Sequence, residues 1–141
     1  MIMPTYEEIK IGDSASFTKT VSESDIYMFA GVTGDLNPAH IDEEYAKKTM
    51  FKGRIAHGML GAGFISAVLG TRLPGPGTIY LTQELRFKAP VRIGDTITAT
   101  CKVAEKDDAK RKLTMETVVA NQDGKAIIEG IAVVMLPAQA G

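Results

Sequence analysis

The residues best suited to chemistry lie in the heptapeptide GDLNPAH, at positions 34–40. It holds a carboxylate at Asp35, an amide at Asn37 and an imidazole at His40, which is one of only two histidines in the chain. An aspartate and a histidine that share a cavity can exchange protons with water or a substrate, because carboxylates are ionised at neutral pH and imidazoles titrate close to it. The heptapeptide therefore raises the hypothesis of an acid–base pair.

The spacing of these two side chains leaves a second interpretation open. On a continuous helix, residues five apart point about 140° away from each other. Pro38 ends such a helix and favours an extended Asn37, so a loop could turn both side chains into one cavity. The alternative is an ordinary polar turn, in which Gly34 closes a helix, Asn37 and Pro38 form an Asx turn and His40 lies on the surface. Spacing alone favours the turn.

Further candidates lie in the apolar stretch that begins at His57. Gly58 would open a helix there, and free N–H groups at a helix start can bind a developing oxyanion. The alternative is a glycine-softened helix start beside a core histidine. Ser66 is the lone hydroxyl within this apolar helix, and such serines commonly bond back to the carbonyl four residues earlier. A metal site built from Asp35, His40 and His57 is disfavoured, because the chain has few histidines and no tight ligand spacing.

Other chemistries lack their motifs. The sequence contains no Gly-x-Ser-x-Gly elbow and no phosphate-binding loop, which argues against serine-hydrolase and nucleotide-hydrolase sites. Cys101 falls on the apolar face of an expected strand and is interpreted as a packing residue. A single cysteine cannot form an internal disulfide, which fits a reducing cytoplasm.

The size and charge of the chain are those of one soluble domain. Its 141 residues suit a single domain spanning 1–141. The 16 basic and 17 acidic residues nearly cancel, so no strong field would attract nucleic acid or an anionic membrane. The start, MIMPTYEEIK, has no signal-peptide core, and the longest apolar region, residues 55–73, falls short of a membrane span. We therefore expect a cytoplasmic protein with neither nucleic-acid nor membrane partners.

The first half of the chain has helical patterns. Ser22 or Ser24 would cap a helix over residues 22–34, where apolar side chains recur at the spacing of one buried face. A short second helix is expected over residues 41–49, with acids at its start and lysines at its end. The helix after His57 is apolar nearly all round, so other structure must enclose it. The run LPGPG then ends it.

The second half alternates apolar and polar residues with period two, which is typical of strands. The breaks between these segments are short and rich in turn residues, which favours an antiparallel meander. Over residues 78–89, Ile79, Leu81, Leu85, Phe87 and Ala89 are expected on one face, with Gln83 as the one exception to the alternation. The sum is an α+β fold in which about five antiparallel strands wrap around a central helix. The expected strands cover residues 14–21, 78–89, 95–105, 112–120 and 125–136.

From residue 29 onward the sequence resembles the MaoC-like (R)-specific enoyl-CoA hydratases, also called type-2 enoyl-CoA hydratases. The resemblance rests first on the Gly-Asp-x-Asn-Pro-x-His core at 34–40, supported by Phe29, Thr33 and Ala46. The stretch RIAHGMLGAGFISAVLG is similar to that family's central-helix segment, and LRFKAPVRIGDTI is similar to its sheet. The resemblance implies a hot-dog fold, in which an antiparallel sheet wraps around a long central helix. It also implies a homodimer with acyl-thioester sites at the interface.

The same resemblance implies roles for individual residues. Asp35 and His40 would be the catalytic pair, and the Gly58 N–H would bind the thioester oxygen, with Asn37 and Ser66 in support. The implied reaction is reversible syn addition of water to a trans-2-enoyl-CoA, giving the (R)-3-hydroxyacyl-CoA, with acyl-CoA as the substrate and no metal or other cofactor.

Three other functions stay open at this stage. They are dehydration of acyl groups on an acyl-carrier protein, hydrolysis by a hot-dog acyl-CoA thioesterase, and acyl-CoA binding without catalysis. Hot-dog thioesterases use different acidic arrangements, so the heptapeptide argues against hydrolysis.

Overall fold

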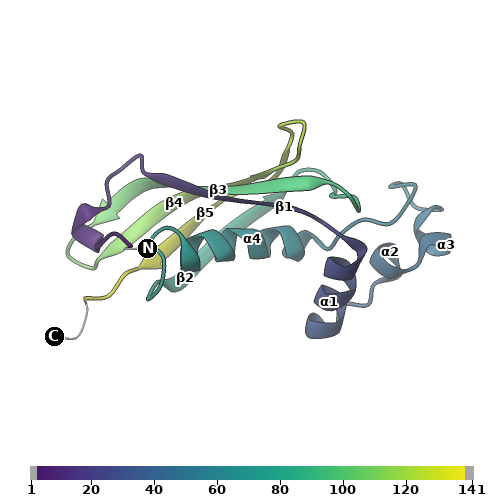
Figure 1. Ribbon diagram of the computed structural model, residues 1–141, viewed down its shortest axis with the longest axis horizontal. Helices are drawn as coiled ribbons and strands as arrows, with labels where there is room; N and C mark the ends of the chain where they lie inside the picture. Colours follow the sequence, from purple (N-terminus) through teal and green to yellow (C-terminus); the bar gives the residue numbers. More distant parts are fainter. Residues whose placement is uncertain (1–2, 139–141) are drawn as a thin grey trace.

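An antiparallel sheet runs beside a central helix in the computed structural model, which describes residues 3–138. The strands are β1 (Ser14–Thr20), β2 (Ile79–Phe87), β3 (Thr96–Asp107), β4 (Lys112–Ala120) and β5 (Ala126–Met135). The helices are the 3-10 turn η1 (Tyr6–Glu8), α1 (Glu23–Thr33), α2 (Pro38–Ile41), α3 (Glu43–Ala46) and α4 (Gly58–Thr71). Figure 1 shows α4 lying along the sheet, with α1, α2 and α3 grouped beyond its amino end.

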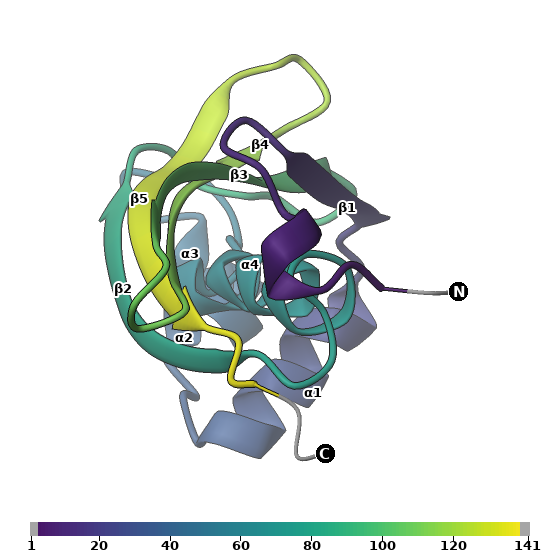
Figure 2. The same ribbon diagram turned by 90° about the vertical axis from the view of Figure 1, so that its left-hand side faces the viewer.

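The sheet has the order β1-β3-β4-β5-β2, and all neighbouring strands are antiparallel. Strands β3, β4 and β5 form the expected meander. The prediction of a meander is wrong for β2, which pairs with β5 at the far edge instead of with β3. Residues 88–95 make this crossing because eight residues reach well beyond the ~14 Å across three strand spacings. Figure 2 shows the sheet curled around α4, as the expected fold requires.

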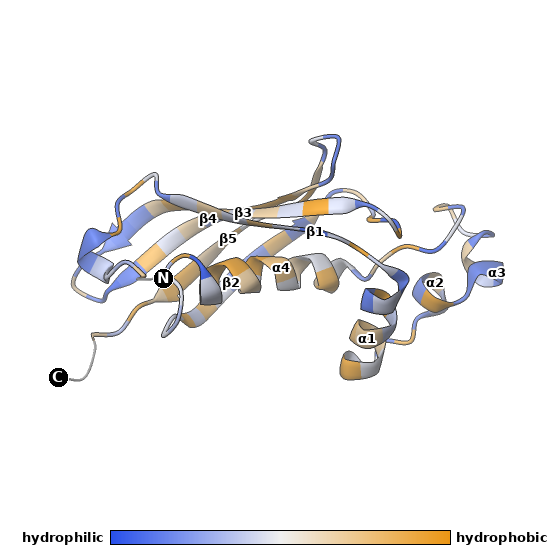
Figure 3. Cartoon of the chain, viewed as in Figure 1, coloured by the Kyte–Doolittle hydropathy of each residue, from blue (hydrophilic) through white to orange (hydrophobic). Residues whose placement is uncertain are grey.

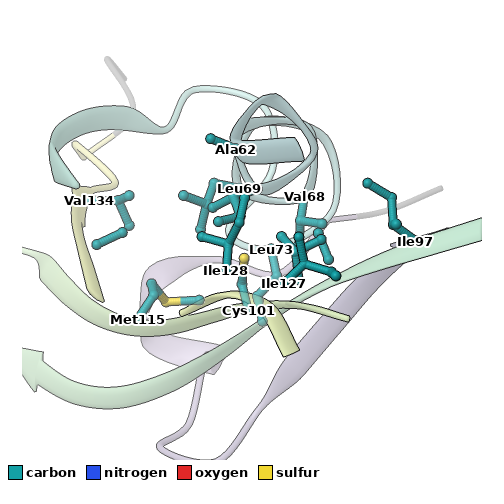
Figure 4. Close-up of a cluster of buried hydrophobic side chains, with 14 of the residues drawn as sticks. Ala62, Val68, Leu69, Leu73, Ile97, Cys101, Met115, Ile127, Ile128 and Val134 are labelled. Carbon is teal, nitrogen blue, oxygen red and sulfur yellow. The ribbon is translucent and has the colours of Figure 1, made fainter. Parts of the chain in front are cut away.

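The core lies between α4 and the concave face of the sheet. Figure 4 shows Val68 and Leu69 of α4 beside Cys101 and Ile128 of the sheet. Removing such side chains from water stabilises the fold by roughly 1.5–3 kcal/mol each. Alternate residues of β3 and β4 are completely buried, namely Ile97, Ala99, Cys101, Val103, Leu113, Met115, Thr117 and Val119.

The prediction that other structure encloses α4 is only partly correct. Hydropathy colouring shows the helix apolar along most of its length (Figure 3). One stripe nevertheless stays exposed, formed by Met59, Gly63, Ser66 and Gly70. Within residues 3–138, no helix combines the length and apolar character needed to cross a membrane.

Strand β2 departs from simple alternation at Leu81. Its register with β5 shifts between residues 80 and 82, which marks a bulge. As a result, Tyr80 and Gln83 both lie opposite buried residues of β5. The expected grouping of Ile79 with Leu85 on one face is therefore wrong, because one extra residue reverses the faces.

The side chain of Gln83 crosses β5 where that strand has a glycine. Its Nε2 donates to the Thr117 hydroxyl on β4 at 3.0 Å and to the Glu84 carbonyl at 2.8 Å. A Cβ at residue 130 would overlap the Glu84 carbonyl oxygen and lie 3.1 Å from Gln83 Nε2. Only glycine leaves room for both the strand pairing and this polar contact.

We predict that Gly130→Ala destabilises the protein by about 3 kcal/mol or more, because the added methyl overpacks a paired backbone that cannot move aside. Urea denaturation measures the change. The matched control is Gly31→Ala on α1, where an added Cβ meets nothing within 4 Å and helix propensity favours alanine. Equal stability of Gly130→Ala and the unmodified protein would contradict this account of the strand contact.

Candidate active site

The end of helix α1 positions Asp35 in the site. Ser22, one of the two serines expected to cap this helix, accepts the Asp25 N–H at 3.1 Å, and Asp25 accepts the Ser22 N–H at 2.9 Å. The helix ends at Thr33, and Gly34 closes it in the left-handed conformation with φ 81°. Asp35 therefore emerges directly from a fixed helix end.

His40 stands on a helix of its own. Asn37 caps α2 by accepting the Ala39 N–H at 3.1 Å, and Pro38 occupies the first helical position, where it needs no hydrogen bond. The short helix expected over 41–49 is present as α3 but covers only Glu43–Ala46, because Ile41 belongs to α2 and Asp42 caps α3 by accepting the Tyr45 N–H. Asn37 thus shapes the loop. The surface position that the polar-turn interpretation gave His40 is also wrong, since its side chain is buried.

Hydrogen bonding fixes the tautomer of His40. Its Nδ1 lies 2.7 Å from the Ile55 carbonyl oxygen. Because a carbonyl only accepts, Nδ1 carries the hydrogen and the neutral ring has its lone pair on Nε2. Arg54 holds the same segment by donating from Nε to the His40 carbonyl at 2.7 Å. It also pairs with Glu23 of α1 at 2.9 Å, which lowers the pKa of that glutamate.

The structure brings Asp35 and His40 together, and His57 with them. One ligand atom from each of the three side chains lies within 4.8 Å of the others. Asp35 is exposed, and its Oδ1 accepts the Asn37 N–H at 3.3 Å. The sequence predicts His57 as a core histidine, and its burial agrees with this. Its position directly before Gly58 and its place in the disfavoured metal-ligand set were the signals that it could also adjoin the site.

These three side chains are also the metal-ligand set that the scarcity of histidines and the wide ligand spacing disfavour. One nitrogen of each ring already donates to a backbone carbonyl, His40 to Ile55 and His57 to Asp35. The remaining His57 nitrogen, Nδ1, is buried. The cluster is therefore organised by hydrogen bonds to the backbone.

Gly58 lies beside this cluster as the first residue of α4. Its N–H has no carbonyl one turn earlier to bond to, and it sits at the positive end of the helix dipole. The Phe87 ring packs against it, 2.8 Å from where a Cβ would lie. A mostly apolar cavity of ≈ 360 Å³ adjoins the same position, and its lining includes His57, Gly61 and Ile128.

Two other candidates lie away from the pair. Ser66 is exposed on α4, eight residues beyond Gly58 and thus about 12 Å farther along the helix. Cys101 is buried in the sheet, and burial raises the pKa of its thiol to about 12. The interpretation of Cys101 as a packing residue agrees with this position.

Comparison with known proteins identifies the family. Residues 8–125 match the family described as "MaoC like domain". The chain belongs to the MaoC-like family. Its five-stranded antiparallel sheet around a helix is the hot-dog fold of the MaoC-like hydratases, as the sequence resemblance implied.

Relatives in this family have closely similar sequences and structures. The chain is 60% identical over 139 residues to an (R)-specific enoyl-CoA hydratase of Rhodospirillum rubrum, covering 99% of this chain and 96% of the relative. The structure of unliganded R-hydratase PhaJ1 from Pseudomonas aeruginosa is similar with a TM-score of 0.90 and 47% identity, covering 96% of this chain and 86% of that one. The structure of the (R)-hydratase of A. caviae involved in PHA biosynthesis is also similar, with a TM-score of 0.90 and 39% identity. The match covers 93% of this chain and 99% of that one.

Proposed function

We propose that this protein is a hydro-lyase that adds water reversibly to trans-2-enoyl-CoA and forms (R)-3-hydroxyacyl-CoA. The observation that carries the proposal is the convergence of Asp35 and His40 beside the start of α4, where Gly58 presents the first N–H of the helix. The 60% identity to an (R)-specific enoyl-CoA hydratase over nearly the whole chain supports the same reaction.

The acid–base pair activates water. The Asp35 carboxylate accepts a proton from a water molecule as the water oxygen bonds to C3 of the substrate. His40 Nε2, with its lone pair free, accepts a hydrogen bond from the second O–H and so aims the oxygen. Asp35 then returns the proton to C2 on the same face. One water is added in total, and the pair regains its starting state.

The Gly58 N–H stabilises the charge that this addition creates. As the oxygen bonds to C3, electron density moves through C2 to the thioester oxygen. A preorganised N–H at a helix start meets that charge without reorganising. The apolar cavity beside Gly58 suits an acyl group, because its lining, including Phe87 and Ile128, carries little polar surface.

The first experiment mixes purified protein with crotonyl-CoA and follows the loss of enoyl absorbance and any release of free thiol. Loss of absorbance without thiol release is expected. Thiol release without a 3-hydroxy product would instead identify a thioesterase. Saturable binding without turnover would identify a binding module. Higher rates on the crotonyl ester of an acyl-carrier protein than on crotonyl-CoA would identify the carrier-protein dehydratase.

Removing divalent metals should leave the rate unchanged. General acid–base catalysis by a carboxylate and an imidazole requires no metal. The measurement compares hydration rates before and after dialysis against EDTA. A loss of activity that Zn²⁺ or Mg²⁺ restores would contradict the assignment of the pair as the complete acid–base machinery.

We further propose that two copies of the chain pair through the β2 side of the molecule. Strand β2 lies at an edge of the sheet, where its outer backbone groups have no strand partner within residues 3–138, and it exposes Ile79, Leu81 and Phe87. An exposed apolar edge of this kind favours pairing with another strand. Sedimentation at micromolar concentration should give twice the mass of one chain. A monomer under these conditions would exclude the dimer.

A further inference from the structure

His57 contacts both members of the acid–base pair. Its ring lies 3.9 Å from the His40 ring and 4.8 Å from the Phe29 ring, measured between centroids. Its Nε2 lies 2.9 Å from the backbone oxygen of Asp35. The side chain is only 3% exposed. The proposed proton transfers do not use these contacts, so they need an explanation of their own.

The contact with Asp35 fixes the tautomer of His57. A carbonyl oxygen only accepts, so Nε2 carries the hydrogen and the neutral ring has its lone pair on Nδ1. Nδ1 is buried and has no hydrogen-bond partner among residues 3–138. A buried polar atom without a partner destabilises a fold, and a phenyl ring of similar shape would avoid that cost. Packing alone therefore does not explain a histidine here.

The Nε2–H of His57 restrains the turn that carries Asp35. It holds the Asp35 carbonyl, while the Asp35 carboxylate accepts the Asn37 N–H at 3.3 Å two residues later. The ring face of His57 meanwhile restrains the plane of the His40 ring. His57 also immediately precedes Gly58, so one residue links the backbone that carries Asp35, the His40 ring and the helix start.

We propose that His57 is a positioning residue that sets the distance between the Asp35 carboxylate and His40 Nε2. The inference rests on the proposed function, because it concerns the two side chains to which that function gives the proton transfers. Displacing a reacting group by about 1 Å commonly costs roughly 10²-fold in rate. Losing the Nε2–H should therefore lower kcat and leave KM nearly unchanged.

Two substitutions separate positioning from packing. His57→Phe keeps the ring and removes the donor, whereas His57→Gln keeps an N–H near the place of Nε2 and removes the ring. We expect His57→Phe to lower kcat for crotonyl-CoA by about 10²-fold with KM changed less than about threefold. His57→Gln should stay within about tenfold of the unmodified enzyme, since it can still bond the Asp35 carbonyl. A phenylalanine variant as active as the glutamine variant, or more active, would overturn the proposal.

Nitrogen-15 NMR of the imidazole rings tests the proposal without a measurement of enzyme activity. Because the chain has only two histidines, the spectrum of His57→Gln assigns both rings, and the spectrum of His40→Asn does so if His57→Gln does not fold. At pH 8.5, where ordinary imidazoles are neutral, we expect the Nδ1–H tautomer for His40 and the Nε2–H tautomer for His57. An Nδ1–H tautomer for His57 overturns the inference, even if both substitutions prevent folding. An inactive unmodified protein with the expected tautomers would contradict the proposed function and leave the geometry intact.

Discussion

Replacing Asp35 with asparagine is expected to lower kcat/KM for crotonyl-CoA by roughly 10³-fold, within the range that a positioned acid–base group contributes. The amide keeps the shape of the side chain and can still accept the Asn37 N–H that forms the turn. It cannot take a proton from water at neutral pH. The loss should therefore appear in kcat, with thermal stability unchanged.

His40→Asn provides the complementary test of the pair. An asparagine can keep a donor near Nδ1 for the Ile55 carbonyl while removing the Nε2 lone pair. The double variant with Asp35→Asn should be little worse than the poorer single variant, because residues that act as one unit are not additive. The control is Asp123→Asn, an exposed carboxylate in the turn after β4. Near-normal hydration by folded Asp35→Asn would contradict the assignment.

Removing the Gly58 N–H should lower kcat by roughly 10²–10³-fold, as for other single oxyanion donors. Among the expected losses of activity, only that of Asp35→Asn should be larger. Proline at this position deletes the N–H, and the first turn of a helix tolerates proline well. His57, the preceding residue, has φ −59° and ψ 136°, which is the extended region that a following proline requires.

A smaller side chain must first replace Phe87, because any Cβ at residue 58 would lie 2.8 Å from the Phe87 ring. We therefore compare Gly58→Pro with Gly58→Ala, both in a Phe87→Leu background. The two variants carry similar bulk, and only the proline lacks the donor. Equal kcat values for the pair would show that the Gly58 N–H takes no part in the reaction.

Local patterns predicted the elements of the fold better than their pairing. Period-two alternation located the strands, and Ser22 and Gly34 marked the ends of α1. The pairing of β2 with β5 was missed because alternation records which face is buried and not which strand is the neighbour. The bulge at Leu81 was missed for a related reason, since a single inserted residue leaves no signal of its own beyond the exception at Gln83.

The candidate site was predictable to the extent that its residues lie in one segment. Asp35 and His40 share a heptapeptide, so a resemblance within that segment was enough to pair them. His57 reaches the site by tertiary packing, 17 residues after His40, and its contacts are to a backbone oxygen and a ring face. Contacts of that kind have no spacing rule in the sequence.

The configuration of the product shows whether this protein hydrates enoyl-CoA with (R) specificity. Crotonyl-CoA is incubated with the purified protein, and the 3-hydroxybutyryl-CoA formed is resolved by chiral chromatography, with Asp35→Asn as the inactive control. We expect a single product, (R)-3-hydroxybutyryl-CoA, that the control does not form at a comparable rate. The (S) product, a racemic mixture, or no hydration of crotonyl-CoA or longer enoyl-CoAs by the folded protein would contradict it.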